Sequence, residues 1–150
     1  MKVVAKLQSK SRVKIFLDAN ILFSAAAPKS NVAKLINIAQ HYGQCVTSPY
    51  AVEEARKNLK LKKFGSLEVF ELLLTKVTTS NKLVLNLPVT IKSKDIPILG
   101  SAIAQKCTYL LTGDKRDFSF LFGKTVAGVT IVSPKLLAEE LVTKGLLKKK

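Results

Sequence analysis

Short apolar runs alternate along the chain with longer segments of helical periodicity, and this alternation limits the fold more than any other feature. Ser30, Ser48 and Ser133 each stand where a helical pattern begins, and the last two precede a proline, which is typical of helix starts. Strands separated by helices pair in parallel, and the helices then cover the sheet. We therefore predict an α/β fold, a three-layer α/β/α sandwich with a mostly parallel central sheet. The runs with the length of buried strands are residues 13–17, 44–47, 107–111 and 129–132.

Four further segments have weaker patterns. A helix is expected over about 66–76, and a short apolar helix over 96–106, directly after Asp95. Residues 83–87 (LVLNL) indicate a strand or a strand-like connection. Residues 118–122 indicate a turn or a short helical segment.

The chain has the size and composition of one domain. It has 150 residues, of which 47% are hydrophobic, and this is enough for a core without disulfides or a structural metal. The sequence has no internal repeat. We expect a single domain over residues 1–150, with a basic N-terminal extension at 1–12 and a basic C-terminal tail at 145–150.

Basic residues strongly outnumber acidic ones: 25 Lys and Arg against 10 Asp and Glu give a net charge of +15. This charge favours nucleic acid, an anionic membrane surface or an acidic protein as a partner. No apolar stretch approaches the roughly 20 residues that cross a bilayer, so we expect no membrane segment. Cys45 and Cys107 lie outside any C-x-x-C motif, which fits reduced thiols in the cytoplasm. His41 is the only histidine, so neither a zinc cluster nor a histidine-based triad is favoured.

The positions of the ten acids are the most informative feature for function. Asp18 directly follows the first predicted strand, and Asp114 follows the strand at 107–111. Ligands of open parallel sheets bind outside the carboxyl ends of the strands, so these two aspartates should lie at the functional edge. Four glutamates fit solvated helix faces and receive no role: Glu68, Glu71, Glu139 and Glu140. The six candidates are Asp18, Glu53, Glu54, Asp95, Asp114 and Asp117.

Carboxylates that converge in one place repel one another unless a cation lies among them. Oxygen ligands of this kind suit hard ions such as Mg²⁺ or Mn²⁺. One or two such ions can activate water and stabilise the leaving oxygen in phosphodiester cleavage, while the basic surroundings hold the polyanion. The acids therefore indicate a metal-dependent site for a nucleic-acid substrate.

Simpler interpretations of single acids stay open. Asp95 could be a helix N-cap, and Asp117 a turn residue or a partner of Lys115 or Arg116. Glu53 and Glu54 would ordinarily form a solvated helix face. Helix geometry favours Glu54 as the inward one, because it flanks the buried face of its helix while Glu53 points further toward solvent.

Four segments in this order resemble the PIN domain family, in the branch that includes VapC-like toxins. The resemblance runs from about Val13 to Leu141, although the family's first strand often begins almost at the initiator methionine. It implies a small α/β/α protein, and many members are Mg²⁺- or Mn²⁺-dependent ribonucleases. The segments are FLDANIL (16–22), SPYAVEEARKNL (48–59), KDIPILGSAIAQKCTYLLTGDKRDF (94–118) and GVTIVSP (128–134).

The resemblance also implies site residues. The four acids of the family motif match Asp18, Glu54, Asp95 and Asp114, which are thereby expected to be the catalytic metal ligands. Asp117 matches an auxiliary acid and is the fifth candidate ligand. Asn20 and Thr112 match polar residues that orient carboxylates or substrate.

The sequence thus predicts a metal-dependent endoribonuclease, with the toxin of a toxin–antitoxin pair as one form of it. Lys115 and Arg116, beside the acids, are the candidates for contact with RNA phosphates. An antitoxin and a homodimer are further partners that the resemblance raises. Two alternatives stay open: a non-catalytic RNA-binding module, and a Mg²⁺-dependent phosphotransfer domain on a doubly wound sheet. Against the latter, position 20 is Asn where phosphatases of the haloacid dehalogenase type have a second Asp.

Overall fold

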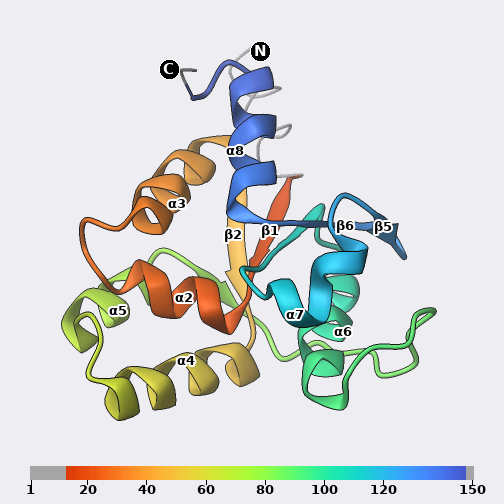
Figure 1. Cartoon of the computed structure of the whole chain (residues 1–150), viewed down its shortest axis with the longest axis horizontal. Helices are drawn as coiled ribbons and strands as arrows, with labels where there is room; N and C mark the ends of the chain where they lie inside the picture. The colour runs from red at the N-terminus through yellow and green to blue at the C-terminus, as the bar shows by residue number, and fades with distance from the viewer. Residues whose placement is uncertain (1–12, 148–150) are drawn as a thin grey trace.

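A six-stranded sheet forms the centre of the computed structural model, which describes residues 13–147 (Figure 1). The strand order is β3-β2-β1-β4-β6-β5, and all neighbours pair in parallel except β5 with β6. The mostly parallel α/β/α architecture expected from the sequence is confirmed. The strands are β1 (Lys14–Leu17), β2 (Gln44–Thr47), β3 (Thr78–Thr79), β4 (Tyr109–Leu111), β5 (Thr125–Val126) and β6 (Val129–Val132).

Helices lie on both sides of the sheet, with α2 to α5 on one side and α6 and α7 on the other (Figure 1). Serine side chains cap four of them: Ser30, Ser48 and Ser133, as the sequence predicts, and also Ser66. Each accepts a hydrogen bond from the backbone N–H three residues later. The helices are α2 (Ala19–Ala25), α3 (Asn31–Tyr42), α4 (Pro49–Lys62), α5 (Leu67–Leu74), α6 (Ile96–Ala104), α7 (Lys115–Phe118) and α8 (Pro134–Thr143), with 3-10 turns η1 (Ser93–Asp95) and η2 (Ser119–Leu121).

The core explains why the central strands read as continuous apolar runs. Ile15, Phe16 and Leu17 of β1 have no exposed surface, because helices cover both faces of this strand. Cys45 and Cys107 are buried free thiols, as the sequence indicated. Among the described residues, no helix is long and apolar enough to cross a membrane.

The structure differs from the sequence expectations in the connections. Residues 83–87 form no strand; they are largely exposed, and Val84 N donates one hydrogen bond to the Gly100 carbonyl. A Cβ at position 100 would collide with the Val84 carbonyl, so this close approach requires glycine. Helix α2 and the two-residue strands β3 and β5 were not anticipated. The N-terminal extension at 1–12 and residues 148–150 of the tail lie outside the described residues.

The topology places the ends of β1 and β4 side by side. From β1 the chain moves to β2 and β3 on one side, then returns to β4 on the other side of β1. The order in which strands are added to the sheet thus reverses between the parallel neighbours β1 and β4. Open α/β sheets bind their ligands at such a point. The residues that follow β1 and β4 therefore lie where a functional site is expected.

Candidate functional site

A pocket of about 260 Å³ opens at the carboxyl ends of β1 and β4, beside α2 and α4. The four acids predicted to be catalytic all line it, although they lie far apart in the sequence. Its lining residues are Asp18, Ala19, Asn20, Phe23, Tyr50, Glu54, Asn58, Lys62, Lys94, Asp95, Ile98 and Asp114.

Asp18 connects the end of β1 to the start of α2. Its Oδ1 accepts a hydrogen bond of 2.6 Å from Ala19 N, so it is the N-cap of α2. Its Oδ2 accepts one of 2.7 Å from the Thr112 hydroxyl and one of 3.3 Å from Asn20 Nδ2. Its side chain is therefore held in one orientation, in a residue with only 5% of its surface exposed.

Thr112 joins the ends of β4 and β1. Its hydroxyl donates to Asp18 and accepts from Asn20 Nδ2 at 3.3 Å and from Asp114 N at 3.1 Å. Asn20 Oδ1 in turn accepts from Gly113 N at 2.7 Å. The two polar residues expected to orient carboxylates thus form one network that links Asp18 to the backbone of Asp114.

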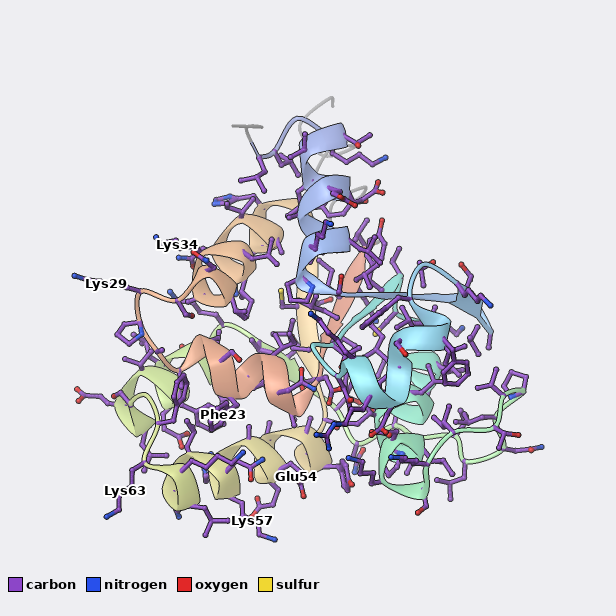
Figure 2. The ribbon with its side chains drawn as sticks, viewed as in Figure 1. Phe23, Lys29, Lys34, Glu54, Lys57 and Lys63 are labelled. Atoms are coloured by element: carbon purple, nitrogen blue, oxygen red, sulfur yellow. The ribbon has the colours of Figure 1, made fainter. Side chains whose placement is uncertain are left out.

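Helix α4 contributes a polar row to the pocket. Tyr50, Glu54, Asn58 and Lys62 recur every fourth residue and all line it. Figure 2 shows Glu54 on α4, the helix that lies beside α2. Glu53 is not part of the lining; its side chain is 82% exposed and lies 3.9 Å from Arg56. The helix phase that favoured Glu54 over Glu53 from the sequence agrees with this geometry.

Three aspartates form the tightest group of acids. One carboxylate oxygen from each of Asp95, Asp114 and Asp117 lies within 4.8 Å of the other two. Asp114 caps α7, with its Oδ1 accepting from the N–H groups of Arg116 and Asp117 at 3.1 and 3.0 Å. Asp18 and Glu54 share the pocket with Asp95 and Asp114 but are not members of this group.

Asp117 is neutralised by lysines that the sequence did not indicate. Lys92 Nζ lies 2.8 Å from its Oδ1, and Lys94 Nζ lies 3.0 Å from its Oδ2. The ion pairs of Asp117 are thus with Lys92 and Lys94 rather than with Lys115 or Arg116, the pairing left open from the sequence. Asp95 does occupy the N-cap position of α6, but its side chain makes no capping hydrogen bond there.

Burial and charge separate the pKa values of these acids. Desolvation by burial raises the pKa of Asp18 to about 6, against the lowering effect of the Thr112 hydrogen bond. Burial, with the hydrogen bond that the protonated Asp95 carboxyl donates to Asp117 as the next cause, raises the pKa of Asp95 to about 7. Lys92 and Lys94 hold the pKa of Asp117 well below its usual range. Two of the pocket acids therefore resist ionisation unless positive charge is added.

The donor set fits a divalent cation. Asp95 Oδ2 is buried and has no hydrogen-bond partner, although it lies in the acidic group. A buried carboxylate oxygen without a partner is costly, and a cation bound there would remove the cost. Carboxylate oxygens are the ligands that Mg²⁺ and Mn²⁺ prefer.

The predicted RNA contacts lie beside the pocket rather than in it. Lys115 and Arg116 are exposed at the start of α7, and neither lines the pocket. Lys94 and Lys62 do line it, yet sequence reasoning missed both. A signal for Lys62 was present, because it continues the four-residue period of Glu54 and Asn58 along α4. Lys94 gives no comparable signal, since it precedes α6 in a segment without periodicity.

Comparison with known proteins identifies the family. The sequence profile described as the PIN domain matches residues 14–116. The chain belongs to the PIN domain family. No curated protein matches its sequence. The alternative of a Mg²⁺-dependent phosphotransfer domain is set aside, because the chain belongs to the PIN family and not to a phosphatase family.

Solved structures resemble this PIN domain in fold. The structure of VapBC2 from Rickettsia felis, bound to a DNA fragment from the VapBC2 promoter, aligns with a TM-score of 0.56 and 13% identity. The alignment covers 81% of this chain and 98% of that chain. FitAB bound to an IR36 DNA fragment aligns with a TM-score of 0.49 and 16% identity, over 80% of this chain and 94% of that chain. At this identity the likeness to VapBC2 shows a common fold.

Proposed function

We propose that this PIN domain is a Mg²⁺- or Mn²⁺-dependent endoribonuclease whose catalytic acids are Asp18, Glu54, Asp95 and Asp114. One observation carries the proposal: these four acids, from separate parts of the chain, line one pocket. The pocket lies beside β1 and β4, where the strand order of the sheet reverses. PIN domains are generally nucleases. The net charge of +15 around an acidic pocket suits a polyanionic substrate that is cleaved at a cation.

We assign three roles to the residues: cation binding, orientation of a ligand, and contact with RNA phosphates. Asp18, Glu54, Asp95 and Asp114 would hold the cation, with Asp117 as a further oxygen ligand that Lys92 and Lys94 partly neutralise. When bound, the cation supplies activation of water and stabilisation of negative charge on the phosphate. Thr112 and Asn20 fix the orientation of Asp18. Lys115 and Arg116 are proposed to contact phosphates beside the scissile one.

We further propose that the domain acts as the toxin of a toxin–antitoxin pair in the cytoplasm. Support comes from the fold that it has in common with VapBC2. A homodimer is proposed because the resemblance of the sequence to VapC-like toxins implies one. The proposal is tested by expressing the chain alone in a bacterial host: the wild type should arrest growth, and Glu54→Gln should not. Growth arrest by both would contradict a role for cleavage.

The paired glutamates of α4 provide a matched test of the site. Glu54→Gln should reduce RNA cleavage by at least about 10-fold, because it removes one anionic ligand from the pocket. Glu53→Gln makes the same chemical change one residue away and should leave cleavage unchanged, since its side chain is exposed. The measurement is cleavage of a generic RNA across a Mn²⁺ titration, in which excess metal should partly rescue Glu54→Gln.

The outcomes separate the alternatives. Loss of activity in Glu53→Gln alone would mean that the other face of α4 forms the site. Equal activity in both variants would reduce the ligand set to aspartates. A wild-type protein that binds RNA but never cleaves it, with Mg²⁺ or with Mn²⁺, would favour the non-catalytic RNA-binding module.

The charge of the chain leads to a prediction about salt. RNA binding by an inactive variant should weaken steeply between about 50 and 200 mM salt, because each neutralised phosphate of a single strand releases counterions and contributes about −0.7 to the slope of log K against log salt. Fluorescence anisotropy with a labelled RNA measures this slope. A flat dependence would contradict the argument that the basic surface binds the polyanion.

A further inference from the structure

Two phenylalanines stack at the α4 end of the pocket. The rings of Phe23 and Phe64 lie with their centroids 4.5 Å apart and their planes 17° from parallel. Phe23 lines the pocket and lies between α2 and α4 (Figure 2). Phe64 has 39% of its surface exposed. Phe23 therefore covers one face of the Phe64 ring, while Phe64 keeps an exposed surface.

The backbone fixes this aromatic pair in place. Helix α4 ends at Lys62, and its C-cap residue Lys63 adopts the left-handed conformation with φ of 49°. Gly65, on the other side of Phe64, has φ of 62°. These two residues turn the chain back toward α2, where Ser66 N donates a 3.1 Å hydrogen bond to the Ala26 carbonyl. A Cβ on Gly65 would lie 2.9 Å from that carbonyl. Phe64 is therefore presented by a defined turn.

Among the described residues, four lysines of α4 and the turn after it have no close carboxylate, and one of them, Lys62, lies over the Phe23 ring. Lys62 Nζ lies 5.7 Å from the centroid of the Phe23 ring. Lys57, Lys60 and Lys63 are exposed on the same helix and turn, and Figure 2 shows Lys57 and Lys63 projecting outward from α4. Within residues 13–147, none of these four lysines has a carboxylate within 4.0 Å. An aromatic face amid cations is the arrangement that binds single-stranded nucleic acid.

Phe23 and the acids line one pocket, and Phe64 stacks on Phe23 outside that lining. The α4 row that begins with Glu54 reaches Lys62 through Asn58, and all three line the pocket together with Phe23. Eight residues of α-helix correspond to about 12 Å. A short run of nucleotides covers such a distance, so a strand whose phosphate lies at the acids reaches the aromatic pair with a neighbouring base.

We propose that Phe64, supported by Phe23, is a stacking platform for an unpaired base of the RNA substrate. The inference rests on the proposed function and names the residue that binds a base of the RNA near the cleaved bond. In a duplex both faces of each base are already stacked, so a duplex cannot offer a base to Phe64. Lys62 and its neighbours bind the phosphates on either side of that base.

The absence of tryptophan from the sequence allows a direct test. In an Asp18→Asn background, Phe64→Trp introduces a single tryptophan at the platform, which is excited selectively over the three tyrosines. Its fluorescence should be quenched by an unpaired oligoadenylate and not by the same strand annealed to its complement. Phe120→Trp is the matched control, because Phe120 is 55% exposed on η2 and does not line the pocket. Its fluorescence should change with neither RNA.

Affinity gives a second, independent measurement. Phe64→Leu retains an apolar side chain but removes the aromatic face, and should raise the Kd for the unpaired strand at least about fivefold without changing the Kd for the duplex. Phe120→Leu should change neither. Equal quenching by paired and unpaired RNA, or an unchanged Kd in Phe64→Leu, would overturn the proposal. These measurements need no cleavage, so an inactive wild type would refute the proposed nuclease without affecting the platform.

Discussion

Asp18→Asn should abolish RNA cleavage. Without metal, the variant should also lose less free energy of unfolding than the wild type when the pH is raised from about 4 to about 7. Burial raises the pKa of Asp18 from 3.8 to about 6, so between these values the folded state holds a proton that the unfolded state has released. The stability that this proton provides is complete below about pH 4 and is lost as the pH rises through about 6. The loss corresponds to about 3 kcal/mol.

The difference between two pH values isolates this charge effect. Thr112 and Asn20 both donate to Asp18 Oδ2, so an asparagine amide at this position costs hydrogen-bond energy. That cost is the same at both pH values and cancels. Urea unfolding of wild type and Asp18→Asn with a chelator, at about pH 4 and about pH 7, should therefore show a drop of free energy that is about 3 kcal/mol larger in the wild type than in the variant. The drop that the variant keeps includes the contribution of Asp95, whose pKa burial also raises.

Two controls accompany this measurement. Glu53→Gln removes an exposed carboxylate and should keep the pH dependence of the wild type. Added Mg²⁺ or Mn²⁺ should raise the melting temperature of the wild type far more than that of Asp18→Asn, because the cation binds the folded state through this acid. A variant that fails to fold at either pH would mean that Asp18 is structural and that the site assignment is wrong.

The sequence predicted the central strands because burial on both faces leaves a local pattern. β1 is an apolar run that ends at an acid. β2, β4 and β6 are likewise short and mostly buried, although no acid follows them directly. The segment LVLNL at 83–87 has the same pattern without a neighbouring strand to pair with, and local pattern alone cannot distinguish the two cases. Strands β3 and β5, with two residues each, are too short to leave a signal.

Helix α2 was missed because its cap is also a candidate ligand. Asp18 follows the strand, accepts a hydrogen bond from Ala19 N and lines the pocket. It was interpreted as a metal ligand, so its role as a helix N-cap was not considered. The seven residues of α2 are mostly apolar and lack the polar face that reveals amphipathic helices. Recognising Asp18 as a cap would have placed Asn20 and Phe23 on this helix, beside α4.

The convergence of four acids on one pocket could be predicted in different ways. Topology placed Asp18 and Asp114, helix phase favoured Glu54, and the family resemblance implied Asp95. The environment of Asp117 could not. Lys92 and Lys94 reach it from a segment with no periodic pattern, and only the folded chain places them against α7. Contacts of this kind depend on tertiary packing, so no spacing rule connects residue 92 to residue 117.

Thr112→Val should impair the site although Thr112 is not expected to touch substrate. The hydroxyl has no exposed surface and joins Asp18, Asn20 and Asp114 N. Its removal leaves buried polar groups without a partner, at about 1–3 kcal/mol each. It also removes the hydrogen bond that lowers the pKa of Asp18, so this pKa should rise further above 6. Cation affinity and activity should fall about 10- to 100-fold.

A second buried threonine separates positioning from stability. Thr47 also has no exposed surface, and its hydroxyl donates one 2.8 Å hydrogen bond to the Leu17 carbonyl, outside the pocket lining. Thr47→Val should therefore lower the free energy of unfolding without moving the acidic limb of the pH–activity profile. Thr112→Val should move that limb to higher pH, because Asp18 then ionises later, and Thr112→Ser should restore it. A limb that moves equally in Thr47→Val and Thr112→Val would assign the effect to general loosening of the strand ends; a limb that moves only in Thr112→Val requires that this hydroxyl sets the charge of Asp18.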